Sequence, residues 1–128
     1  MIQSFVDTNV LVRFFVGDNK RQQTQVRHWF AEVNTGVRKI VITSIVVAET
    51  VFVLESFYKK SHEEIAATLL PFLALPVLDV PERDVLTRLW GLYIDGFHFV
   101  DSYLLACARV SGVEILTFDT ELKKRLSL

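Results

Sequence analysis

The sequence predicts an α/β fold in which a parallel sheet is covered by helices. Short apolar runs alternate along the chain with longer segments that carry an apolar residue every three or four positions. The short runs are continuously apolar, so each strand is expected to be buried on both faces. Buried strands that alternate with amphipathic helices are typical of parallel sheets.

The first half of the chain predicts two strands and three helices. In order, these are a strand at 2–6, a short helix at 10–16, a helix at 20–34, a strand at 39–43 and a helix from Ser44 to about Phe57. The 20–34 segment repeats apolar residues at helical spacing, with Val26, Trp29 and Val33 on one face. Ser44 is expected to cap the last of these helices.

The second half predicts four helices and two strands. In order, these are a helix from a capping box at 61–64 toward Pro71, a strand at 77–80, a helix from Pro81 to near Gly96, a helix at 99–110, a strand at 113–118 and a helix capped by Asp119 that runs to Leu126. Gly112 is expected to stop the 99–110 helix. The 113–118 run is apolar except for one Glu and one Thr.

Composition narrows the class of protein. With 128 residues the chain is expected to form one domain over residues 1–128. A hydrophobic content of 51% excludes a disordered chain, and a net charge of −1 excludes a generally basic nucleic-acid coat. The lone Cys107 excludes an internal disulfide and fits a cytoplasmic protein. The most apolar stretch, 41–54, is shorter than the ~20 residues of a membrane span, and no export signal is expected at the start.

Four carboxylates are expected at one edge of the sheet. Asp7 and Asp119 directly follow predicted strands, and Glu49 lies in the first turns of a helix that follows another. Asp101 lies near the start of a helix that precedes a strand. Because a crossover helix runs antiparallel to the strands, its start also lies at their carboxyl edge, where sites form in such sheets.

Each acid alone has a simpler interpretation. Asp7 ends a strand, and Asp101 and Asp119 suit helix starts. Glu49 stands in an apolar helix, where a carboxylate needs a partner or a metal unless it points to solvent. Together, converging acids without matching Lys or Arg repel one another, and Mg²⁺ or Mn²⁺ relieves that repulsion. A metal held in this way activates water and stabilises phosphoryl charge, which is the chemistry of phosphodiester hydrolysis.

Four segments, taken in order, resemble the PIN-domain ribonucleases and, among them, the VapC-type toxins of toxin–antitoxin pairs. They are Phe5-Val6-Asp7-Thr8-Asn9-Val10-Leu11, Ser44-Ile45-Val46-Val47-Ala48-Glu49, Phe99-Val100-Asp101-Ser102 and Leu116-Thr117-Phe118-Asp119. The resemblance implies a three-layer α/β/α sandwich with a mostly parallel central sheet. It implies a metal-dependent endoribonuclease whose catalytic and metal-binding residues are Asp7, Glu49, Asp101 and Asp119, with Mg²⁺ or Mn²⁺ as cofactor.

The resemblance also implies accessory residues and partners. Asn9 and Thr117 match accessory polar positions, and Glu121 falls where many members carry another acid. The implied partners are an RNA substrate, an inhibitory antitoxin protein and a second copy in a homodimer. Arg13 lies close to the site along the chain and would contact RNA phosphate or an antitoxin carboxylate, although a solvated helix charge is an equal interpretation. Arg38 is expected to be a surface charge.

Other classes of protein fit less well. A receiver domain would have an acid beside Asp7 and a Lys where Asp119 stands, and a haloacid-dehalogenase phosphatase would have Asp in place of Asn9. A non-catalytic PIN-like module that binds RNA or protein stays open as an alternative. The presence of all four acids argues against it.

Overall fold

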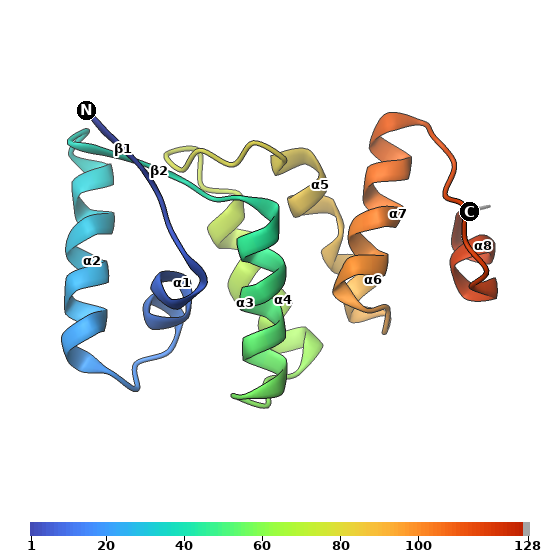
Figure 1. The fold of residues 1–128 in the computed structure, drawn as a ribbon, viewed down its shortest axis with the longest axis horizontal. Helices are drawn as coiled ribbons and strands as arrows, with labels where there is room; N and C mark the ends of the chain where they lie inside the picture. The colour runs from blue at the N-terminus through green and yellow to red at the C-terminus, as the bar shows by residue number, and fades with distance from the viewer. Residues whose placement is uncertain (127–128) are drawn as a thin grey trace.

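The computed structural model describes residues 1–126, and Figure 1 shows its ribbon. The elements are β1 (Ile2–Phe5), α1 (Thr8–Phe15), α2 (Lys20–Asn34), β2 (Arg38–Val41), α3 (Ser44–Ser56), α4 (His62–Leu73), α5 (Arg83–Arg88), α6 (Trp90–Ile94), α7 (Phe99–Ser111) and α8 (Thr120–Leu126). In that described range no helix is long and apolar enough to cross a membrane.

The sheet is parallel, as predicted, and it is small. β1 and β2 pair with Ile2 opposite Arg38 and Phe5 opposite Val41. Within residues 1–126 the far edge of β2 meets the chain again only at a bridge between Val41 and Asp79. Among residues 1–126 no strand pairs with the far edge of β1. The α/β class is confirmed, and the arrangement is consistent with a three-layer α/β/α fold.

Several helix starts follow from local capping. The Asp7 carboxylate accepts a hydrogen bond from the Val10 amide at 3.1 Å and begins α1. The capping box of Ser61 and Glu64 is confirmed at the start of α4. The prediction that Ser44 caps α3 is wrong, because Thr43 occupies the cap position and the Ser44 hydroxyl bonds the Glu82 carboxylate instead.

The apolar side chains form two clusters. The larger one packs α1, α3, α4 and the sheet around fully buried residues such as Leu11, Ile42 and Val51. The smaller one joins α6, α7 and α8 through Leu92, Leu105 and Leu122. The second cluster holds α8 against α7, so the C-terminal helix is tied to its neighbours by packing (Figure 1).

The sequence prediction is wrong for two strands and one helix. Residues 77–80 contribute only the bridge at Asp79, and residues 113–118 form no strand. A strand forms only where its backbone groups can hydrogen-bond to a neighbouring strand, and neither segment lies along such a strand over its whole length. The helix predicted from Pro81 to Gly96 begins at Arg83 and is divided at Leu89 into α5 and α6.

Candidate acidic site

Asp7 and Glu49 form the first half of the candidate site. Asp7 stands at the end of β1, where it caps α1. Glu49 projects from α3, and α1 packs against α3. The buried Thr8 hydroxyl donates a hydrogen bond to the Glu49 carboxylate, which places Glu49 beside the residue that follows Asp7. Glu49 is therefore tied to the residue next to Asp7, at the carboxyl end of β1.

Asp101 and Asp119 form the second half. Both line one hollow of about 310 Å³, together with Asp95, Glu121 and Arg125. Asp101 lies in the first turn of α7, and Asp119 precedes α8. The Asp119 carboxylate accepts hydrogen bonds from the backbone amides of Glu121 at 2.8 Å and of the next residue at 3.1 Å. This half is held by the packing of α8 on α7.

The four acids do not converge within this chain. Among residues 1–126 no group of three or more His, Cys, Asp or Glu side chains lies close enough to hold a metal ion. The expected convergence depended on a strand at 113–118 in the same sheet, which would bring Asp119 to the sheet edge where Asp7 lies. That strand does not form, so the site stands as two separate pairs of carboxylates.

The accessory residues divide between the two halves. Asn9 lines a hollow of about 230 Å³ next to Asp7. The Thr117 hydroxyl accepts a hydrogen bond from the Asp119 amide at 3.0 Å, so Thr117 orients the backbone that carries Asp119. Glu121 lines the second hollow and pairs with Lys124 at 3.7 Å.

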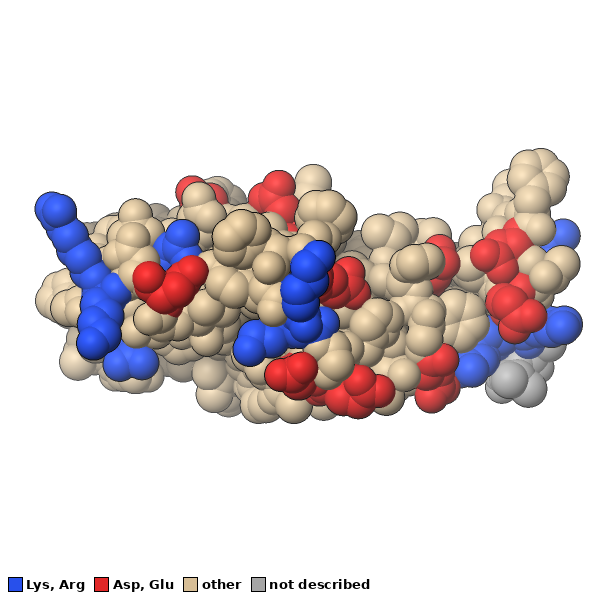
Figure 2. All heavy atoms as spheres, turned by 90° about the horizontal axis from the view of Figure 1, so that it is seen from below, with Lys and Arg blue, Asp and Glu red and all other residues tan. Residues whose placement is uncertain are grey.

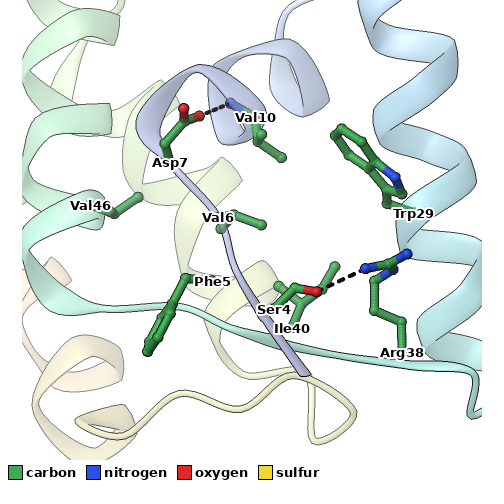
Figure 3. Close-up of a pocket in the computed structure, with 9 residues that line it drawn as sticks. All are labelled: Ser4, Phe5, Val6, Asp7, Val10, Trp29, Arg38, Ile40 and Val46. Carbon is green, nitrogen blue, oxygen red and sulfur yellow. Dashed lines mark hydrogen bonds between the residues drawn. The ribbon is translucent and has the colours of Figure 1, made fainter. Parts of the chain in front are cut away.

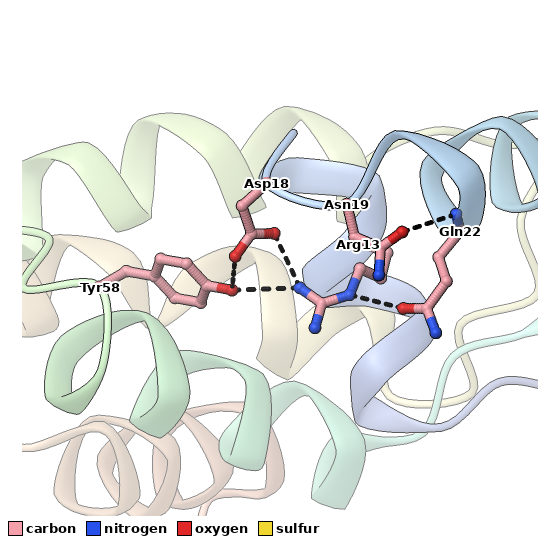
Figure 4. A network of polar contacts seen from close by, with 5 residues as sticks. All are labelled: Arg13, Asp18, Asn19, Gln22 and Tyr58. Carbon is pink, nitrogen blue, oxygen red and sulfur yellow. Dashed lines mark hydrogen bonds and ion pairs between the residues drawn. The ribbon is translucent and has the colours of Figure 1, made fainter.

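Arg13 lies near the first half, but its charge is already engaged. Its guanidinium binds Asp18 at 2.8 Å, the Tyr58 hydroxyl at 3.1 Å and Gln22 at 2.8 Å (Figure 4). The Tyr58 hydroxyl donates to Asp18 at 2.6 Å. The hydrogen bond from Tyr58 and the charge of Arg13 lower the pKa of Asp18, and the contact with Tyr58 raises the pKa of Arg13. The order of residues in the sequence does not indicate that Asp18 and Tyr58 engage this arginine.

A pocket of about 540 Å³ follows β1 up to Asp7 (Figure 3). Trp29 of α2 and Val46 of α3 line it from two sides. Arg38 was expected at the surface, yet its side chain is only 18% exposed, and it donates to the Ser4 hydroxyl at 2.8 Å. The Arg38 Nε atom is buried without a hydrogen-bond partner. The burial of Arg38 cannot be inferred from its place in the sequence, since the next residue, Lys39, is also basic and is exposed.

The charge around these acids suits a divalent cation better than an ion pair. In the described range none of Asp7, Glu49, Asp101 and Asp119 forms an ion pair with Lys or Arg. All four offer carboxylate oxygens, which Mg²⁺ and Mn²⁺ prefer. Figure 2 shows basic and acidic side chains interspersed over one face of the molecule, in keeping with the net charge of −1. Contact with a nucleic acid would therefore be local.

Comparison with known families identifies the class of protein. The model of the PIN domain family matches residues 4–125, which is nearly the whole chain. Comparison with curated proteins and with solved structures finds no significant match.

The chain belongs to the PIN domain family. The fold of that family is α/β, in agreement with the parallel sheet described above, and its members are in general nucleases. Membership thus indicates nuclease activity and contact with RNA as the general function.

Proposed function

We propose that the protein is an endoribonuclease that depends on Mg²⁺ or Mn²⁺ and hydrolyses RNA phosphodiester bonds as a single nuclease domain. The observation that carries this proposal is the placement of four carboxylates in two pairs, without a neutralising Lys or Arg, in a chain of the PIN family. Asp7 and Glu49 form one pair, and Asp101 and Asp119 form the other. Each pair lies at the start of helices whose positions the fold fixes.

The donor set fits a hard divalent cation. Asp7, Glu49, Asp101 and Asp119 would hold it once the two pairs are brought together, and when bound the ion would supply activation of water and stabilisation of negative charge on the phosphoryl group. Thr8 would keep Glu49 in place through its hydrogen bond. Asn9, Thr117 and Glu121 would assist by orienting the acids or a water molecule near them.

RNA would enter beside the first pair. The pocket along β1 ends at Asp7 and offers Trp29, on whose ring a base can stack, and Arg38, which is cationic. Contact between phosphate and such a cation releases counterions, so binding should weaken as salt rises. Both arginines have an acidic partner, since Arg13 pairs with Asp18 at 2.8 Å and Arg38 with Glu32 at 3.4 Å. Of the two, Arg38 lines the pocket along β1, so we assign the phosphate contact to Arg38.

The toxin role rests on the four-segment resemblance alone. We propose that a cognate antitoxin blocks the acidic site and is contacted by Arg13. We also propose that the protein forms a homodimer and acts on RNA in the cytoplasm. An Arg13→Glu change should then weaken antitoxin binding. The Arg13→Glu change would also break the ion pair between Arg13 and Asp18. Asp18→Asn is therefore the matched control, because it breaks the same ion pair and leaves Arg13 in place.

Cleavage of RNA in the presence and absence of metal tests the enzymatic proposal. Purified protein should cleave single-stranded or loop RNA with Mn²⁺, lose activity in EDTA and regain it when Mn²⁺ is restored. Asp7→Asn and Asp119→Asn should both abolish cleavage while the circular dichroism spectrum stays unchanged. Full activity in EDTA would refute the metal mechanism.

The alternative is a non-catalytic module that binds RNA or protein. It would show RNA binding without cleavage and no Mn²⁺ binding that depends on the four acids. Calorimetry with Mn²⁺ separates the two proposals, since only the nuclease requires the acids to take up metal.

A further inference from the structure

A hollow of about 230 Å³ lies between α1 and α2 and opens beside Asp7. Its apolar side is formed by Val10, Val26 and the half-buried Trp29. Trp29 also lines the pocket along β1, so the two spaces adjoin at this indole ring. An apolar wall with a few polar groups is typical of a site for a small organic ligand, and an accessible indole suits a flat base.

The polar side of this hollow carries hydrogen-bond donors that are not in use. Arg13 Nε donates to Gln22 Oε1 at 2.8 Å, and Arg13 Nη1 donates to Asp18 and Tyr58. Within residues 1–126, Arg13 Nη2 and Gln22 Nε2 have no hydrogen-bond partner. Figure 4 shows both of these nitrogens on the side of the contact that faces away from Asp18.

The contact between Arg13 and Gln22 fixes what the hollow offers to a ligand. A guanidinium can only donate, so the amide oxygen of Gln22 must face Arg13 and the amide nitrogen is left to donate elsewhere. Asp18 and Tyr58 hold the guanidinium from its other end. The two free nitrogens are therefore positioned before a ligand arrives, which reduces the entropy lost on binding.

We propose that this hollow binds a guanine base of the RNA substrate, which stacks on Trp29 and accepts hydrogen bonds from Arg13 Nη2 and Gln22 Nε2. One edge of guanine carries two neighbouring acceptors, O6 and N7, which match a pair of donors. The inference rests on the proposed function for the RNA and adds a base preference to it. Because Asp7 also lines the hollow, the backbone of the bound nucleotide would lie beside the acidic site.

The other bases fit this pair of donors less well. Adenine has an amino group next to N7, so it would present a donor to a donor. Uracil separates its two carbonyl acceptors by an N–H group. Cytosine has two neighbouring acceptors, but its single ring covers less of the indole of Trp29 than a purine does. Guanine alone combines the acceptor pair with the larger stacking face.

The fluorescence of Trp29 tests the base preference without cleavage. The chain has two tryptophans, and Trp90 is only 2% exposed, so quenching by a stacked base reports on Trp29. Uridine oligonucleotides with one central guanosine, adenosine or cytidine are titrated into the protein in EDTA. We expect the guanosine oligonucleotide to bind about tenfold more tightly than the other two. Equal affinities, tighter binding of adenosine or cytidine, or no binding of any oligonucleotide would overturn the inference.

A change of one atom in the ligand tests the hydrogen bonds and needs no protein variant. An oligonucleotide with 7-deazaguanosine lacks the N7 acceptor and keeps the stacking face. It should bind wild-type protein at least about fivefold more weakly than the guanosine oligonucleotide. Undiminished affinity would show that N7 accepts no hydrogen bond and would overturn the proposed recognition.

A protein variant tests the donor itself. Gln22→Glu keeps an oxygen for Arg13 Nε and replaces the amide donor with an acceptor, so the preference for guanosine should be lost. The matched control is Gln23→Glu, which adds the same charge to α2 at a residue whose side chain lies against Gly17 and does not line the hollow. Gln23→Glu should keep the preference. Equal loss in both variants, or an unchanged preference in Gln22→Glu, would refute the role of Gln22.

These measurements separate the base preference from the proposed nuclease activity. A protein that prefers guanosine in EDTA but cuts no RNA with Mn²⁺ would refute the proposed function and leave the guanine site standing. Cleavage that depends on Mn²⁺, together with equal affinity for all three oligonucleotides, would refute the guanine site and leave the nuclease standing.

Discussion

Replacing Thr8 with Val should weaken metal binding without touching a carboxylate. The Thr8 side chain is 8% exposed, and its hydroxyl donates to the Glu49 carboxylate. Valine has nearly the same shape, so Thr8→Val removes the donor and leaves the packing of α1 on α3 in place. Glu49 is itself exposed and regains water, so the carboxylate is not left buried without a partner.

The size of the effect follows from the kind of bond that is lost. A hydrogen bond to a charged group contributes about 1.5–3 kcal/mol when buried, and rehydration of Glu49 reduces this to about 1 kcal/mol. For a chain of this size that corresponds to a fall of roughly 4 °C in Tm. Loss of a partner that orients a metal ligand typically weakens metal affinity about 10–100-fold. The Mn²⁺ concentration for half-maximal cleavage should rise by that factor.

Two titrations with one control test this prediction. Mn²⁺-dependent cleavage and thermal unfolding in EDTA are measured for the wild type, Thr8→Val and Thr8→Ser. Serine restores the donor, so Thr8→Ser should take up Mn²⁺ like the wild type. If Thr8→Val bound Mn²⁺ as tightly as the wild type, Glu49 would not be a metal ligand positioned by Thr8.

Three further predictions concern stability. Asp101→Asn should raise the metal-free Tm by roughly 2–4 °C, because Asp101 shares a hollow with several acids that repel it. Millimolar Mn²⁺ should narrow or reverse the difference in Tm between wild type and variant. The same difference in Tm with and without Mn²⁺ would contradict this prediction. Tyr58→Phe should lower the free energy of unfolding at neutral pH, because the hydrogen bond from Tyr58 lowers the pKa of Asp18. This contribution is present above the usual Asp pKa near 3.8 and is lost as the pH falls through the lower pKa of the folded protein. The urea midpoints of wild type and variant should therefore converge in acid, and a difference that stays constant with pH would refute the link. Leu122→Ala should lower the free energy of unfolding by about 2–4 kcal/mol, because α8 is expected to unfold together with the rest of the chain. A urea transition in two steps would show that α8 unfolds separately and would contradict this expectation.

Much of the fold could be predicted because its signals are local. The capping box of α4 and the cap of α8 by Asp119 each depend on a few consecutive residues. The first helix was expected from residue 10 and begins two residues earlier, at Thr8, because Asp7 caps it. The segment 113–118 was predicted as a strand from its composition. Its side-chain alternation agrees with that, but pairing depends on a distant edge that composition does not specify.

The site was predicted less completely than the fold. The cap of α8 by Asp119 agrees with the prediction. Glu49 is exposed, the alternative that its apolar helix left open, and its carboxylate accepts a hydrogen bond from Thr8. The engagement of Arg13 by Asp18 and the burial of Arg38 were missed. Both depend on which charged side chains meet after folding, and neighbouring charges in the sequence do not reveal this.

Calorimetric titration with Mn²⁺ tests the central claim most directly, namely that the two pairs of carboxylates serve one metal site. Wild type, Asp7→Asn and Asp119→Asn are titrated under the same conditions, with Asp79→Asn as a control outside the site. The account predicts that wild type and Asp79→Asn bind Mn²⁺ alike and that each of the other two changes abolishes binding. Undiminished Mn²⁺ affinity in either Asp7→Asn or Asp119→Asn would contradict it.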